Sequence, residues 1–567
     1  MFDLEVKNKQ NKFSTLFNFA YKSLVLVPIS LLFFISNVVF NLQNNLVLRD
    51  QINISCVVIL ITISAIVYIV NFAMSFKWRR LAMLEFLDIA NNTKLPKKLP
   101  KVIYVYTTKN DFMPARLLQN MQQSYKNIEY WISVGGKNDI NIEKIKKFAK
   151  ENNVNLFVMD RPSNNKADNL NSFLKYNKSK FDYLLIGDAD VAFDKNFVET
   201  SLKFFYSDKA IRLGYVSSTL MNYRGNNAFT NAILAYENER FIIRDQNSNY
   251  YFNFSANLYS SCCLISRKML EEMNYEFPDS NLEDQYTEKF ANKNAWVGII
   301  SPLSIAMQSF DKDIWANLNR ISRVFTWGIK YQKTQFFNKY SVRYSNTNKK
   351  HFQDLFLGFI FIFGFIMTTI LVWWFFINYK NIFTGVFQIV TLSSFIINGL
   401  LILISRGILL KHLSENDGIK ISILVPFYNI VLMINLFKYW FEALFLSRYK
   451  TFLKTEKFNV KNKTIILWIQ LFVFLSILIS GNCVLFVYKT YNINNGWIYL
   501  IIFFNFVFLF AFLYCLSFLV LIWAGKIRSN YEYSDDNFVY CTNNFILQTR
   551  VKKEYIELRK GKEELNV

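Results

Sequence analysis

Two carboxylates one residue apart, Asp188 and Asp190, are the groups in this sequence best suited to hold a metal ion. They follow the hydrophobic run 183–186, Tyr-Leu-Leu-Ile, so we expect them at the end of a buried strand. Alternate residues of an extended chain point the same way, and carboxylate oxygens suit a hard divalent cation such as Mg²⁺ or Mn²⁺. Such an ion would neutralise a diphosphate while a bond to it breaks. Asp-x-Asp pairs also occur in solvated turns, but the preceding strand favours the metal site.

The residues around this pair alternate between strand-like and helix-like segments. Strands are expected, from their β-branched and aromatic residues, at 102–106, 128–134, 154–159 and 182–187. Helices are expected between them, at 112–125, 140–152 and 166–178. This alternation predicts a largely parallel sheet covered by helices, with ligands bound at the carboxyl ends of the strands.

A second motif opens the helix that leads into the acidic strand. Residues 165–171 read Asn-Lys-Ala-Asp-Asn-Leu-Asn, and Asp-Ala-Asp follows about 20 residues later. The combination resembles the family 2 glycosyltransferases of the cellulose, β-glucan, chitin and hyaluronan synthase type. The resemblance implies a GT-A-like (Rossmann-like) α/β domain that binds a nucleotide sugar. It places Lys166 and Asp188 at the nucleotide, and Asp188 and Asp190 at a Mg²⁺ or Mn²⁺ ion.

A second acidic pair lies further along the chain. Residues 282–285, Leu-Glu-Asp-Gln, look like the family's Thr-Glu-Asp motif with Leu in place of Thr. The resemblance implies that Asp284 is the general base that deprotonates the acceptor hydroxyl, with Glu283 beside it. Two acids at a helix start could instead cap the N–H groups of that helix. The separation of about 95 residues from Asp190 matches the family.

The family's last motif, Gln-x-x-Arg-Trp, is altered in this chain. Arg320 and Arg323 share one helix face at i and i+3, and Trp327 follows one turn later. The resemblance implies that the two arginines contact the donor diphosphate and that Trp327 contacts the acceptor sugar. A helix at a membrane surface would also carry Arg and Trp for structural reasons alone.

The nucleotide end of the site departs from the family as well. Asn110 and Asp111 follow the first strand and resemble the family's Tyr-Asn-Glu loop, which implies contact with the nucleotide. After the second strand the family usually has Asp residues that bind uracil, and here only Asp139 follows Gly-Gly-Lys-Asn. Either Asp139 substitutes for them or the base is held differently, and the expected donor is a UDP-sugar. The two histidines, His351 and His412, offer no His-rich metal site.

Composition indicates that much of the chain lies in lipid. Hydrophobic residues make up 52% and charged residues 19% of 567, which is too apolar for an ordinary soluble enzyme. Runs long enough to cross a bilayer are expected at 24–40, 54–74, 355–377, 382–404, 465–488 and 497–524. The apolar run 421–446 contains Pro426, Lys438 and Glu442, so we expect an interfacial or re-entrant helix there.

The basic residues give this arrangement an orientation. The net charge of +23 is concentrated beside the apolar runs, which indicates membrane orientation and anionic lipid rather than nucleic acid. The positive-inside rule then places both termini and the middle domain in the cytoplasm of a cell-membrane protein. The six cysteines form no CxxC pair, as expected for a reduced compartment. The expected organisation is 1–75 with two spans, a catalytic domain at 76–350, four spans within 351–524, and a basic tail at 525–567.

Together these features favour an inverting, metal-dependent transferase that extends a polysaccharide and passes it outward between its helices. A second hypothesis keeps the chemistry and makes a membrane lipid the acceptor, which the altered arginine motif favours. A third is a non-catalytic membrane protein with this fold. It is disfavoured because Asp188, Asp190, Glu283 and Asp284 are all present.

Overall fold

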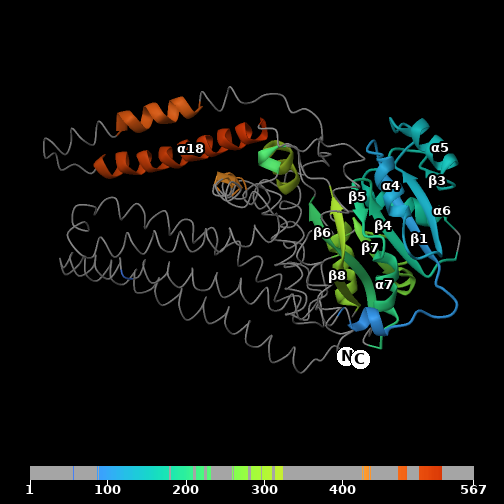
Figure 1. Cartoon of the computed structure of the whole chain (residues 1–567). Coiled ribbons are helices and arrows are strands. Elements are labelled where there is room, and N and C mark those ends of the chain that lie inside the picture. Colours follow the sequence, from blue (N-terminus) through green and yellow to red (C-terminus); the bar gives the residue numbers. More distant parts are fainter. Residues whose placement is uncertain are drawn as a thin grey trace.

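The computed structural model in Figure 1 shows an α/β domain beside several helices. The described residues are 55, 86, 88–177, 180–208, 212–222, 227–230, 258–259, 261–278, 283–294, 296–308, 313–322, 424, 427–428, 430–432, 435, 470–481 and 497–526.

The first half of the domain is a parallel sheet with helical crossovers. Strands β1 (Val102–Thr108), β2 (Ile128–Val134), β3 (Asn155–Val158) and β4 (Tyr183–Asp188) lie in the order β3-β2-β1-β4. The crossovers contain α4 (Pro114–Met121), α5 (Ile142–Glu151) and α6 (Lys166–Tyr176). All three neighbouring pairs are parallel. The alternation expected from the sequence is confirmed for this half.

The second half makes the sheet mixed, which corrects the prediction of a largely parallel one. Its elements are β5 (Val191–Phe193), α7 (Phe197–Phe205), β6 (Leu213–Asn222), β7 (Cys262–Ser266), α10 (Arg267–Glu272), α11 (Glu283–Lys293) and β8 (Val297–Gln308). The eight strands follow the order β3-β2-β1-β4-β7-β6-β8-β5. Strand β7 is antiparallel to β4 and β6, and β5 is antiparallel to β8. Because β5 follows β4 with no crossover helix, the alternation rule does not extend to this part.

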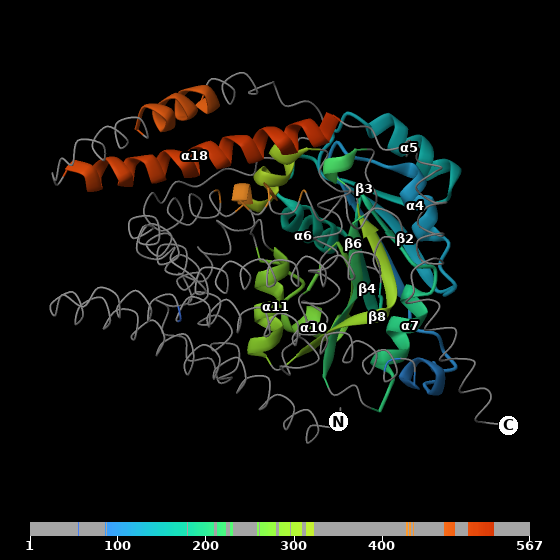
Figure 2. The same ribbon diagram turned by 60° about the vertical axis from the view of Figure 1, so that its left-hand side comes forward.

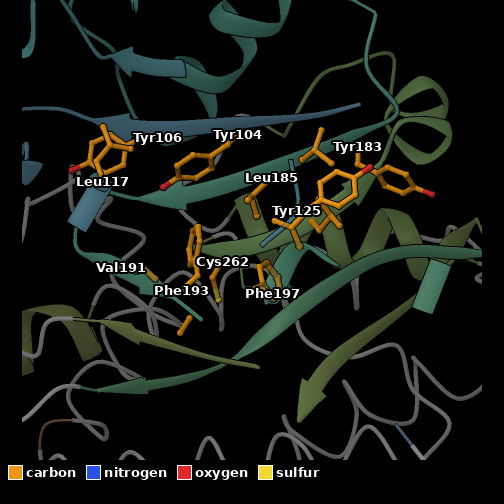
Figure 3. Close-up of a cluster of buried hydrophobic side chains, with 14 of the residues drawn as sticks. Tyr104, Tyr106, Leu117, Tyr125, Tyr183, Leu185, Val191, Phe193, Phe197 and Cys262 are labelled. Carbon is orange, nitrogen blue, oxygen red and sulfur yellow. The ribbon is translucent and has the colours of Figure 1, made fainter. Parts of the chain in front are cut away.

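The core of the domain lies on both faces of the sheet. Tyr104 and Tyr106 of β1 pack into one buried cluster, and Ile103 and Val105, the alternate residues, pack into the other. Figure 3 shows the first cluster, where the ring of Tyr104 meets that of Phe193 edge-on at 5.6 Å. Every residue of β1 is therefore buried, as expected for a central strand of a parallel sheet.

One glycine is required by this packing. A Cβ atom on Gly187 would lie 2.6 Å from the hydroxyl of Tyr104 and 2.8 Å from the ring of Phe193. The two aromatic rings therefore occupy the space that any side chain would need. Because Gly187 immediately precedes Asp188, this close packing fixes the end of β4 where the acidic pair begins.

Beside the domain lies helix α18 (Trp497–Lys526), with the helix at 470–481 alongside it (Figure 2). The rings of Phe474 and Phe508 join them at a centroid distance of 6.0 Å. Among the residues that the structure describes, no helix is both long enough and apolar enough to cross a membrane. The expected spans at 24–40, 355–377 and 382–404 lie outside the described residues, as does 54–74 except for one residue.

Candidate active site

The predicted loops meet where the order of the strands reverses. From β1 the chain proceeds outward to β2 and β3 and then returns to β4 on the other side of β1. Thr107 of β1 is paired with Asp188 of β4, so the carboxyl ends of both strands open at one place. In open α/β sheets, ligands bind in the crevice at such a reversal point. Asn110 and Asp111 follow β1, and Asp188 and Asp190 lie at the end of the neighbouring strand β4.

Lys166 pairs with the first of these acids. It is the first residue of α6, whose N-cap Asn165 accepts a hydrogen bond from the N–H of Asp168 at 2.9 Å. Its Nζ lies 2.5 Å from Oδ1 of Asp188, and the two side chains are 18% and 34% exposed. The pair is thus held by the fold and still reachable by a ligand.

The pKa values of the pair reflect the surrounding charges. Burial acts to lower the pKa of Lys166, but Asp188, Glu283 and Asp284 outweigh it and raise that pKa overall. Burial raises the pKa of Asp188, with Lys166 opposing the rise and Asp190 and Glu283 adding to it. Lys166, at the start of α6, therefore interacts electrostatically with acidic residues from two distant parts of the sequence, at 188 and at 283–284.

The second acidic pair begins α11. Burial and the charge of Glu283 raise the pKa of Asp284 to about 7, against the lowering effects of the Gln285 N–H and of Lys166. The Gln285 N–H donates to Oδ1 of Asp284 at 2.8 Å, so the side chain also makes the local contact expected at a helix start. A carboxyl group with a pKa near 7 can accept and release protons at neutral pH.

The loops after β1 and β2 are tied together by the residues predicted at the nucleotide. Asn110 has φ of 61°, its N–H donates to Asp139 Oδ2 at 2.5 Å, and its Oδ1 accepts from Ile140 N–H at 2.9 Å. Asp139 is 5% exposed and also accepts from the Asn141 N–H at 2.8 Å. Asp111 accepts at 2.8 Å from the Lys109 N–H. Asp111 and Asp139 thus bind backbone N–H groups of the loops after β1 and β2.

Of the residues expected in the altered arginine motif, only Arg320 is described, and Arg323 and Trp327 lie outside the described residues. Arg320 is partly exposed on the helix at 314–322, whose Leu318 packs in one apolar cluster with Phe518 of α18. Buried Asn317 of the same helix accepts a hydrogen bond at 2.9 Å from Tyr428, in the run 421–446. The helix that carries Arg320 is therefore packed against α18 and against the described residues of the run 421–446.

The residues expected to hold a metal ion are Asp188 and Asp190. Within the described ranges there is no group of three or more His, Cys, Asp or Glu side chains that could hold an ion. Mg²⁺ is commonly bound through one or two carboxylates, with substrate phosphates and water as its other ligands. The two aspartates at the end of β4 fit this kind of site and not a cage built from protein alone.

The sequence analysis missed the residues that hold the Asp190 loop. Arg116 and Asn120 of α4, with Gln123 just beyond it, donate to carbonyl oxygens of residues 190, 191 and 194. In the helix expected at 112–125, their spacing of four and three residues would place them on one face. This polar face is the one feature of the sequence that could have pointed to these residues. A polar helix face normally indicates exposure to solvent, but these three side chains are buried.

Residues 101–273 match the family model described as Glycosyl transferase family 2. The match includes Lys166, Asp188 and Asp190, and it ends before Glu283 and Asp284. Residues 101–273 are therefore similar to a glycosyl transferase family 2 domain, and they lie in an α/β core with a mixed sheet. No curated protein matches the chain.

Solved proteins of similar structure include a mannosyltransferase and TarS. The mannosyltransferase PcManGT from Pyrobaculum calidifontis, in complex with GDP-Man and Mn²⁺, has 13% identity and a TM-score of 0.39, covering 68% of this chain and 99% of that chain. Residues 1–349 of S. aureus TarS, also solved with UDP, have 12% identity and a TM-score of 0.30, covering 62% and 93%. At these scores neither likeness carries an argument about this chain.

Proposed function

We propose that the protein is an inverting, metal-dependent membrane glycosyltransferase that polymerises sugar from a nucleotide-sugar donor and exports the product. The observation that carries this proposal is the convergence of Lys166, Asp188, Glu283 and Asp284 at the carboxyl ends of β1 and β4. These residues come from three separate segments, and two of the segments lie in the domain matched by the family model. The donor that we propose is a UDP-sugar.

The residues divide the chemistry between them. Asp284 accepts the proton of the acceptor hydroxyl, and the acceptor oxygen attacks the anomeric carbon from the face opposite the diphosphate. The bond between sugar and phosphate breaks, and the nucleoside diphosphate leaves with the electron pair. Lys166, with Arg320 and Arg323, meets its negative charge. A divalent cation held by Asp188 and Asp190 would supply further neutralisation of the diphosphate.

Membrane insertion is supported by exposed apolar side chains outside the domain. Phe472, Val473 and Ile479 on the helix at 470–481 are 62%, 48% and 57% exposed, and Trp523 of α18 is 64% exposed. Contiguous exposed apolar surface usually marks contact with lipid or another protein. We therefore propose a multi-pass cell-membrane protein whose catalytic domain and both termini are cytoplasmic.

The test is to incubate the purified full-length protein in membranes with radiolabelled UDP- and GDP-sugars, adding Mg²⁺ or Mn²⁺. Nucleoside diphosphate release together with a long labelled product supports the polysaccharide synthase. One labelled sugar that extracts with lipid supports transfer to a membrane lipid, which the lack of a Trp directly after Arg323 favours. Failure to free nucleoside diphosphate from any of these donors would contradict the proposal and favour a non-catalytic membrane protein.

A further inference from the structure

The loop that carries Asp190 is held from one side by buried side chains of β1 and α4. Tyr106, Arg116 and Asn120 donate to the carbonyl oxygens of residues 189, 190 and 191, at 3.1, 3.0 and 2.8 Å. Three successive peptide groups are thus each bound by a different side chain. All three of these side chains are almost completely buried, at 1% exposure or less.

Asn120 takes the place of a neighbouring strand. Strand β5 is the last in the sheet and has β8 on one side. On the side facing α4, the Asn120 carboxamide donates to Val191 O and accepts from Phe193 N–H, both at 2.8 Å. A C=O and an N–H two residues apart are the groups that an adjacent strand would bind. The carboxamide therefore fixes β5 as a strand would, directly after the acidic pair.

Arg116 gives this support an electrostatic component. Removing a guanidinium from water is costly unless negative groups compensate for it. Arg116 is fully buried and donates to the carbonyl oxygen of Asp190 itself, at the point where the fold places two carboxylates. The guanidinium is thus a fixed positive group bound to the backbone of Asp190 itself.

We propose that Arg116, together with Tyr106 and Asn120, positions Asp190 for a divalent cation bound with the donor diphosphate. These are positioning residues, since they act on the backbone of 189–193 and not on the substrate. The inference rests on the proposed function and assigns to α4 a part in it. Its consequence is that cation affinity depends on buried side chains that do not themselves bind the cation.

The test measures Mn²⁺ binding directly, without catalysis. Full-length wild-type protein and variants are titrated with Mn²⁺ in the presence of UDP or GDP, and the loss of the free-ion EPR signal gives the dissociation constant. Arg116→Met should weaken Mn²⁺ binding by roughly 10- to 100-fold, the usual effect of removing a partner that orients a ligand. Tyr106→Phe, which removes one oxygen, should weaken it by roughly 2- to 10-fold.

Gln119→Met is the matched control, because Gln119 lies on the buried part of α4 and makes no described hydrogen bond to residues 189–194. Its Mn²⁺ affinity should equal that of the wild type. The inference would be overturned if Gln119→Met weakened Mn²⁺ binding as much as Arg116→Met does. It would also be overturned if Arg116→Met and Tyr106→Phe both left the Mn²⁺ affinity unchanged. If Arg116→Met does not fold, Tyr106→Phe decides alone. Wild-type protein that binds no Mn²⁺ with either nucleotide would instead contradict the metal dependence in the proposed function.

Discussion

Asp284→Asn should make the protein less active and more stable at once. The pKa of Asp284 rises from an ordinary 3.8 to about 7, so the folded protein resists ionising this group. At about 1.4 kcal/mol per pKa unit, the difference corresponds to roughly 4 kcal/mol at most. The side chain is partly exposed and water screens its charge, so we expect about half of that, ~2 kcal/mol. For a domain of this size, that stabilisation raises the melting temperature by about 4–8 °C.

The sign of the effect fixes its pH window. Between pH 3.8 and about 7 the folded state holds a proton that the unfolded state has released, so the contribution of Asp284 to stability falls as pH rises through this range. The Asp284→Asn variant does not lose stability in this way, because its carboxamide does not ionise. Its advantage over wild type should be near zero at about pH 4, grow up to about pH 7 and then stay constant.

The assay combines thermal unfolding of the full-length protein at several pH values with calorimetry of donor binding and the rate of transfer. Donor binding should persist, while transfer falls by roughly 10²- to 10⁴-fold, the range for loss of a positioned proton acceptor. If Asp284 only caps α11, the variant should instead lose about 1 kcal/mol and keep normal turnover. That result would refute the assignment of Asp284 as the base.

Four further predictions concern other residues of the site, the packing of β4 and the membrane topology. Asp190→Asn should abolish Mn²⁺-dependent release of nucleoside diphosphate in protein that remains folded, and near-normal release would remove its metal role. Glu283→Gln should shift the acid limb of the pH–rate profile to lower pH, because the charge of Glu283 helps raise the pKa of Asp284; an unmoved limb would contradict their coupling. Gly187→Ala should lower the unfolding free energy by roughly 1–3 kcal/mol, as overpacking does, which urea titration measures. A cysteine at Lys454 should resist impermeant labelling from outside intact cells, and modification there would contradict a non-crossing 421–446 run.

The parallel half of the domain could be predicted from the sequence because its elements carry local signals. Strand β2 was placed at its observed bounds, and α6 begins at the predicted Lys166. Buried parallel strands are continuously apolar and are separated by helices of recognisable length, so the pattern is read within each element. The mixed half could not be derived in this way, since β5 has three residues and pairs with β8 more than a hundred positions later.

The candidate site was predictable only in part, for a similar reason. A strand end and a helix start could locate Asp188 and Lys166, but that their side chains form an ion pair depends on how α6 packs on the sheet. The roles of Asp139 and Arg116 depend on backbone groups of other loops, which no side-chain pattern records. Arg323 and Trp327 lie outside the described residues, so their roles stay predictions.

The hydrogen bonds from Asn120 to β5, which replace those of a neighbouring strand, also affect whether the protein can associate with copies of itself. An open sheet edge presents unpaired N–H and C=O groups that can recruit a strand from a second molecule, and this is a common route to aggregation. At β5 the groups facing α4 are occupied within the chain, by Asn120 at Val191 and Phe193 and by Gln123 at Asp194. The contact that orders the acidic loop thereby also closes this edge of the sheet to other molecules.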